Sequence, residues 1–147
     1  MSLIVQKFGG SSVADAEKLR NVARIITDTY KAGNSVVAVL SAQGDTTDDL
    51  IEKAAELNPS ASKREMDMLL STGEQISCAL CAMAIEGMGY PVVSLTGWQA
   101  GFRTNSGYGN ARIKRVKTDR IEEELDKRRI VIVTGFQGIN KSADITT

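Results

Sequence analysis

Four short runs of apolar, largely β-branched residues limit the fold of this chain more than any other feature of its sequence. They lie at residues 3–8, 35–42, 90–98 and 130–136, and turn-forming or polar residues bound them. Runs of this length and composition are typical of strands that are buried on both faces. Segments with helical periodicity separate them, and strands that alternate with helices form right-handed βαβ units. We therefore expect an α/β fold, a three-layer α/β/α sandwich around a mainly parallel sheet.

Most of the segments between these strands are predicted as helices. The first begins at a capping box formed by Ser12 and Asp15 and ends at Gly33. Further helices are expected after the turn at 43–49 up to Leu57, at 62–70, from about residue 72 to 89, and at 118–129. The fourth helix is apolar on nearly all sides, which predicts burial, and the last is charged and expected at the surface. Residues 99–116 predict a β-hairpin instead.

The composition narrows the chemistry that the chain can perform. There is no histidine among the 147 residues, which removes the most frequent general base and the commonest zinc ligand. We therefore expect a reaction that depends on alignment and charge stabilisation. Eighteen basic residues balance eighteen acidic ones, so no overall field attracts nucleic acid or an anionic membrane. The two cysteines and the short apolar N-terminal run predict a cytoplasmic protein without a membrane span.

Ligands of parallel α/β sheets bind beyond the carboxyl ends of the strands. The segments that follow the four predicted strands are rich in glycine and small polar residues, and we expect them to converge on one site. These segments are residues 7–11, 41–47, 95–98 and 134–138.

The first of these segments, Lys7-Phe8-Gly9-Gly10-Ser11, is a candidate phosphate site. It matches neither GxxxxGK[ST] nor GxGxxG. Its glycines nevertheless allow close approach of an anion, the start of a helix offers free backbone amides, and Lys7 adds a positive charge. The alternative is a lysine that points to solvent before an ordinary strand-to-helix turn.

Two further stretches carry candidate ligand residues that also have simpler structural interpretations. The hydroxyls of Ser41, Thr46 or Thr47 could bind a polar ligand above the sheet, but either threonine is also a natural N-cap. Glu74 could bind a ligand ammonium, but Ser71 and Glu74 also have the spacing of a capping box.

Cys78 and Cys81 form a CxxC pair in the middle of a predicted helix. Two sulfurs without a second pair of ligands cannot complete a zinc site, and free cysteine is among the most buried residue types. We expect both thiols to pack in the core, and no metal site is predicted in the chain.

Taken in order, several motifs resemble the amino-terminal part of the aspartate kinases, which have the amino acid kinase fold. The motifs are "KFGGSSVAD", "SAQGDTTDDL", "STGEQIS", "GYPVVSLTGWQAGFRTNSGYGNARI" and "VIVTGFQGIN". Together they cover essentially the whole chain. Acetylglutamate, glutamate and uridylate kinases share the lysine-glycine element, whereas "STGEQ" and "LTGWQAG" point to the aspartate branch.

The resemblance implies a role for each candidate residue. Lys7 would neutralise the transferring phosphoryl group, and Phe8, Gly9, Gly10 and Ser11 would complete the site that cradles it. The resemblance further implies that Ser41 and Thr47 hold L-aspartate and that Glu74 binds its α-ammonium group, with ATP and Mg²⁺ as cofactors. The full enzyme, a homo-oligomer, would make 4-phospho-L-aspartate in the first step of lysine, threonine and methionine biosynthesis.

The resemblance also implies that residues 1–147 are the amino-acid- and phosphate-binding part of a kinase domain, cut before its nucleotide-binding half. The trailing loop after residue 136 and an uncovered sheet edge predict the same truncation. We therefore expect the chain alone to bind MgATP poorly and to turn over little. The alternatives are a non-catalytic binding or assembly module of this fold, or another amino acid kinase such as acetylglutamate kinase. A dinucleotide-binding oxidoreductase is disfavoured, because the glycine spacing differs.

Overall fold

The main sheet of the protein is parallel, as the sequence predicts. The computed structural model describes residues 2–147, and its strands follow the order β1-β2-β6-β3. Their bounds are β1 (Leu3–Phe8), β2 (Ser35–Leu40), β6 (Ile130–Thr134) and β3 (Val92–Leu95). All three neighbouring pairs are parallel, so their carboxyl ends form one edge. The fourth predicted strand, β6, lies inside the sheet, and the described strands at its edges are β1 and β3.

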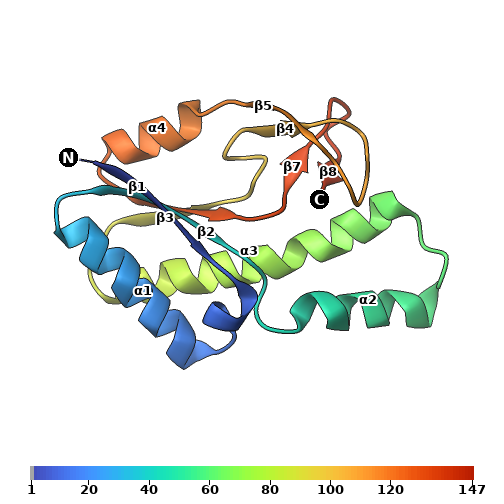
Figure 1. Ribbon diagram of the computed structural model, residues 1–147, viewed down its shortest axis with the longest axis horizontal. Helices are drawn as coiled ribbons and strands as arrows, with labels where there is room; N and C mark the ends of the chain where they lie inside the picture. The colour runs from blue at the N-terminus through green and yellow to red at the C-terminus, as the bar shows by residue number, and fades with distance from the viewer. Residues whose placement is uncertain (1) are drawn as a thin grey trace.

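Helices cover both faces of this sheet and complete the three expected layers (Figure 1). The helices are α1 (Ala16–Lys31), α2 (Thr46–Leu57), α3 (Lys63–Gly87) and α4 (Asp119–Asp126), with a short 3-10 helix, η1 (Gly10–Val13). On one face, α1 and α3 pack against buried residues such as Ile132. On the other, Ile121 and Leu125 of α4 pack against Val131. The first half of α3 projects beyond the sheet, where α2 lies beside it.

A second sheet of four short strands flanks the carboxyl edge of the main sheet. Its order is β5-β4-β7-β8, with β5 (Ile113–Val116), β4 (Phe102–Thr104), β7 (Gly138–Ile139) and β8 (Ile145–Thr146). The antiparallel β4–β5 pair confirms the predicted hairpin. The expectation of a trailing loop is wrong, because β7 and β8 pair with each other and β7 pairs with β4.

The two helices predicted at 62–70 and 72–89 are one helix, α3. Ser62 is its N-cap and accepts a hydrogen bond from the backbone N–H of Glu65. Ser71 lies inside the helix and donates its hydroxyl to the Met68 carbonyl (2.8 Å), so the proposed capping box of Ser71 with Glu74 is wrong. Gly73 does not break the helix. A Cβ at this position would lie 2.9 Å from the Cβ of Ala42, so glycine permits close packing on the turn before α2.

Two other local expectations also need correction. The N-cap of α1 is Asp15, which accepts from the Lys18 N–H (2.8 Å), and not Ser12. The N-cap of α2 is Asp45, and not one of the two threonines that follow. The predicted surface position of the charged helix is confirmed for α4, except that Glu124 is buried and its carboxylate pairs with Arg120 and Arg129.

The long apolar helix α3 is only partly buried. Its length and composition would allow it to cross a membrane, but one of its faces forms part of the core through Cys78, Cys81 and Ile85. A stripe of exposed apolar side chains, Ile76, Leu80 and Met83, follows the opposite face. Both features are typical of a helix that packs with one face on the core of a folded domain.

Gly97 holds the loop after β3 against the segment after β6. Its N–H donates to the Thr134 hydroxyl (2.7 Å), and a Cβ would lie 2.1 Å from the Gln137 carbonyl oxygen. We therefore expect Gly97→Ala to lower the free energy of unfolding by about 1–3 kcal/mol through overpacking. Urea denaturation measures this, with Gly87→Ala as the control, since a Cβ there meets nothing within 4 Å. Equal stability of Gly97→Ala and the unmodified chain would contradict this account.

Candidate active site

A cavity of about 570 Å³ lies between the carboxyl edge of the main sheet and the second sheet. Its lining combines apolar side chains with polar ones, as small-molecule sites do. The apolar lining includes Val39, Leu70, Phe102, Ile113, Val133 and Phe136, and the polar lining includes Thr47, Glu74, Thr104, Asn110, Thr134, Gln137, Thr146 and Thr147. The elements that supply them come from distant parts of the chain, so the cavity exists only in the folded protein.

Glu74 is the charged residue that lines this cavity. The residue is only 7% exposed, and its Oε2 atom has no hydrogen-bond partner. Burial raises the pKa of the Glu74 carboxyl above its ordinary value, while hydrogen bonds from its own backbone N–H and from the Gln137 side chain oppose the shift. A buried carboxylate with an unpartnered oxygen costs free energy unless a cation completes it. The arrangement can therefore bind a ligand ammonium group.

Buried hydrogen bonds fix the cavity floor beside Glu74. The Thr134 hydroxyl donates to the Gln137 Oε1 atom (2.9 Å), and Gln137 donates its Nε2–H to the Ser71 carbonyl (2.7 Å). These bonds join the end of β6 to the middle of α3, one turn before Glu74. The carboxylate is thus held at a fixed position relative to the sheet edge.

The structure brings only some of the predicted site residues to the cavity. Thr47 and Glu74 line it, whereas Ser41 and the segment Lys7–Ser11 do not. These residues do lie along the same sheet edge: the Gly135 N–H donates to the Leu40 carbonyl (3.0 Å), and the Ser41 N–H donates to the Phe8 carbonyl (3.1 Å). The end of β1 is therefore two strand positions from the end of β6, which borders the cavity, or about 10 Å at the usual strand spacing.

The two glycines after β1 have different environments. A Cβ on Gly10 would lie 2.8 Å from the Ala42 carbonyl oxygen, so this position requires glycine for packing. A Cβ on Gly9 would meet no atom within 4 Å, and Lys7 and Ser11 are exposed. The surface above Gly9 is thus open, with a lysine nearby in the chain.

The expected convergence of four segments on one site is only partly correct. Residues 134–138 and Thr47 line the large cavity, but residues 95–98 do not. Leu95 and Thr96 instead line a separate hollow of about 220 Å³, which Cys78 and Gln99 also border. The reason is that β3 is an edge strand, and β6 separates its carboxyl end from β2.

The cysteine pair packs in the core, as predicted. Cys78 and Cys81 are free and buried, and burial raises the pKa of each thiol to about 12. Within residues 2–147, the structure contains no group of three histidine, cysteine or acidic side chains that could hold a metal ion.

Phe136 lies in the segment 134–138 that the sequence predicts at the site, but no pattern marked it as an individual site residue. It has a positive φ of 66° although it is not a glycine, and it is 77% exposed at the cavity. Backbone strain of this kind is concentrated at functional sites. The sequence "TGF" directly after a buried strand is a signal that could have identified it, because an aromatic side chain beyond a strand end is not covered by the sheet.

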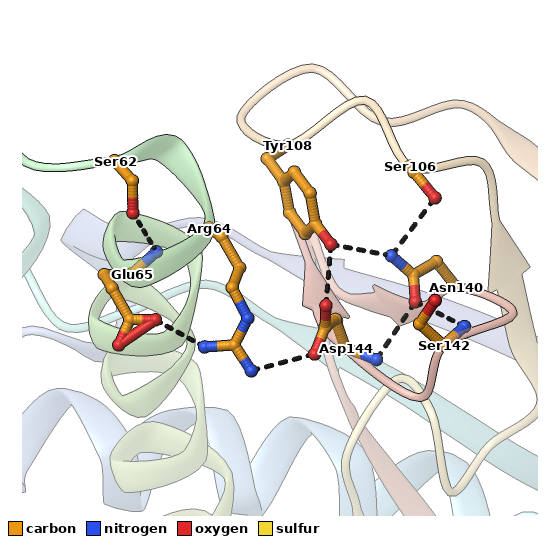
Figure 2. Close-up of polar contacts among 8 residues, drawn as sticks. All are labelled: Ser62, Arg64, Glu65, Ser106, Tyr108, Asn140, Ser142 and Asp144. Carbon is orange, nitrogen blue, oxygen red and sulfur yellow. Dashed lines mark hydrogen bonds and ion pairs between the residues drawn. The ribbon is translucent and has the colours of Figure 1, made fainter.

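A polar network next to the cavity-lining residue Gly109 was also missed. Arg64 at the start of α3 pairs with Asp144 (Nη2–Oδ1, 2.8 Å), and the Tyr108 hydroxyl donates to the other oxygen of Asp144 (2.7 Å) (Figure 2). Asn140 donates to Tyr108 and to Ser106. The Arg64 guanidinium lowers the pKa of the Asp144 carboxyl. The network joins α3 to two loops of the second sheet.

Comparison with known proteins places this fold in a family. The sequence model of the amino acid kinase family matches residues 2–146. The chain belongs to the amino acid kinase family. Among curated members, the aspartokinase of Corynebacterium glutamicum is 57% identical over 148 residues, and that of Geobacillus stearothermophilus is 53% identical over 147 residues. Both alignments cover all of this chain but only 35% and 36% of the relative, so the chain spans about a third of their length.

Solved structures of amino acid kinases share the fold. The aspartate kinase from Synechocystis superposes with a TM-score of 0.82 at 42% identity, over 99% of this chain and 23% of that one. The structure of E. coli aspartokinase III in complex with aspartate and ADP has a TM-score of 0.85 over the whole chain and 43% of its own length. Because the two sequences are only 20% identical, this likeness supports a shared fold and nothing further.

We expect Glu74→Gln to stabilise the ligand-free protein at neutral pH. Because the folded state raises the pKa of Glu74, the stabilising effect of this carboxyl is present below the ordinary glutamate pKa and is lost as pH rises through the raised pKa. As pH rises from the ordinary glutamate pKa through the raised pKa, the melting temperature of the unmodified chain should therefore fall relative to that of Glu74→Gln. Thermal unfolding at a series of pH values measures the difference. The exposed Glu86→Gln on the same helix is the control, and parallel pH profiles for all three proteins would refute the expectation.

Proposed function

We propose that this chain forms the amino-acid- and phosphate-binding part of an aspartate kinase. The reaction transfers the γ-phosphoryl group of ATP to the β-carboxylate of L-aspartate and gives 4-phospho-L-aspartate. The observation that carries the proposal is the buried Glu74 carboxylate, which has an unpartnered oxygen in a cavity at the sheet edge that also bears Lys7. The 50–57% identity to curated aspartokinases favours aspartate over the other substrates of the family.

The cavity suits the amino-acid end of the substrate. Glu74 would take the α-ammonium group, which supplies the missing partner of its Oε2 atom. Thr47 lines the same cavity, and Ser41 lies next to it on the sheet edge, so their hydroxyls would donate to the substrate carboxylates. A buried Glu74 also argues against acetylglutamate kinase as the alternative, because an acetylated α-nitrogen carries no charge and would leave the carboxylate uncompensated.

The segment Lys7–Ser11 suits the phosphate end. The backbone amides of Gly9, Gly10 and Ser11 and the Lys7 ammonium, with Phe8 between them, would stabilise the negative charge of the transferring group. The separation of about two strand positions leaves room for a substrate that spans both subsites.

The chemistry fits a chain without histidine. A carboxylate is already ionised at neutral pH, so it attacks without a general base, and the residues of the chain contribute alignment and charge stabilisation. Bound ATP supplies the phosphoryl group, with Mg²⁺ to neutralise its charge.

We further propose a cytoplasmic homo-oligomer as the setting for this activity.

A second candidate function is a non-catalytic assembly module. The exposed edge of the main sheet favours it, since Leu3 and Val5 of β1 are 57% and 64% exposed. Such a module would function without Lys7, whereas the kinase would lose activity when Lys7 is replaced. The effect of replacing Lys7 therefore separates the two candidate functions.

A chimera tests the kinase proposal. In it, this chain replaces the matching 148-residue segment of the Corynebacterium glutamicum aspartokinase. With L-aspartate and MgATP, the chimera should form an acyl phosphate that hydroxylamine traps, and Lys7→Ala should lower kcat by about 100-fold or more because transition-state charge is left unneutralised. The exposed Lys53→Ala on α2 is the control and should keep full activity.

The 147-residue chain alone is assayed in parallel and is expected to turn over little or nothing. A folded chimera that forms no aspartyl phosphate would refute the proposed function. Full activity of the Lys7→Ala chimera would refute the phosphate role of that lysine.

A further inference from the structure

The outer wall of the cavity comes from the second sheet and its loops. Gly109, Asn110 and Ala111 in the β4–β5 loop, Thr146 at the end of β8 and Thr147 after it line the cavity, and β8 contacts α3. Loops of this kind move unless other groups hold them. The contacts that hold this wall in place therefore decide whether the cavity has a fixed width.

Asp67 makes the central contacts. It lies in the second turn of α3 and is only 1% exposed. Its Oδ2 atom accepts hydrogen bonds from the backbone N–H groups of Gly109 (3.0 Å) and Thr147 (3.1 Å), and its Oδ1 atom accepts from the Thr147 hydroxyl (2.6 Å). Both partners line the cavity, whereas Asp67 does not. The carboxylate thus holds the wall from behind.

The Arg64–Asp144 ion pair supports the same wall from a position one turn nearer the start of α3. Figure 2 shows Arg64 reaching from the helix toward Asp144, which Tyr108 contacts from the neighbouring loop. The Arg64 side chain is 42% exposed, so this pair contributes less than the buried bonds of Asp67.

Asp67 and Glu74 lie on one rigid element. They are seven residues apart on α3, which is about two turns and about 10 Å along the helix axis. Both therefore project from the same side of the helix. Glu74 lines the cavity and has an unpartnered oxygen, and Asp67 fixes backbone of the Gly109 and Thr147 segments that line the same cavity. A single helix therefore positions both Glu74 and this part of the cavity wall.

We propose that Asp67 is a positioning residue for the amino-acid substrate. It acts indirectly, by fixing the Gly109 and Thr147 backbone, which lines the same cavity as Glu74. This inference rests on the proposed function of the cavity. A wall that is fixed before the substrate arrives reduces the ordering cost of binding. Loss of Asp67 should therefore weaken binding of the amino acid. It should leave the phosphate site, which lies further along the sheet edge, unchanged.

The chimera described above allows a direct test with Asp67→Ala and Asp67→Asn. In Asp67→Asn, the amide oxygen can still accept from both backbone N–H groups, and its nitrogen can donate to the Thr147 hydroxyl. We expect Asp67→Ala to raise the KM for L-aspartate about tenfold or more, with kcat and the KM for ATP within about threefold. Asp67→Asn should restore most of the affinity. Glu86→Ala, which removes an exposed carboxylate from the same helix, should behave as the parent.

Hydrogen exchange gives a second readout that does not need turnover. In the 147-residue chain, Asp67→Ala should accelerate exchange at the Gly109 and Thr147 amides while the amides of β2 and β6 keep their protection. If Asp67→Ala fails to fold, Thr147→Val removes the 2.6 Å bond alone, and a several-fold rise in the KM for L-aspartate is expected.

The outcomes separate this inference from the proposed function. An unmodified chimera that does not phosphorylate aspartate refutes the function itself. An active chimera whose KM for aspartate is unchanged by Asp67→Ala refutes the positioning role. That role is also refuted if kcat and both KM values change together, or if Asp67→Asn is no better than Asp67→Ala, because a merely structural residue would give those results.

Discussion

Burial of carboxylates along α3 is the constraint on which the functional part of this structure depends. Asp67 is buried with three hydrogen bonds, and Glu74 is buried with one oxygen left unpartnered. A low-dielectric environment penalises both groups, but only the second is left without full compensation. The fold thus tolerates a local cost at Glu74, which is what makes the position suitable for an ammonium group. The rest of the domain, including both sheets, buries these groups and holds them at fixed positions.

The main sheet could be predicted from the sequence because its strands are apolar and flanked by turns. The second sheet could be predicted only at its hairpin. The strands β7 and β8 have two residues each, too few to show a period, and tertiary contacts such as the hydrogen bond between the Thr104 and Thr146 hydroxyls (2.6 Å) hold them in place. The continuity of α3 was missed for a related reason: Ser71 and Gly73 look like a helix boundary until the packing against Ala42 is known.

The residues of the candidate site also divide into those that the sequence could predict and those that it could not. Glu74 could be proposed from the sequence because its motif is distinctive, and the structure places it at the cavity. The competing explanation as part of a capping box with Ser71 is wrong. Asp67 was not singled out, since one aspartate in a mixed helical segment looks like a solvated residue, and its partners are 42 and 80 residues away in the chain. Phe136 depends on a backbone conformation that no spacing rule reveals. Residues whose role arises from distant contacts are the ones that sequence patterns alone miss.

The exposed edge of β1 has a consequence for the behaviour of the protein in solution. An edge strand with outward Leu3 and Val5 side chains is a template for pairing with the same strand of another molecule. Lys7 lies on this strand, and its charge would have to be brought close to its own copy or desolvated in such a pair. The lysine proposed to bind phosphate would therefore also disfavour pairing through this edge, and its removal would favour such pairing as well as loss of charge at the proposed anion site.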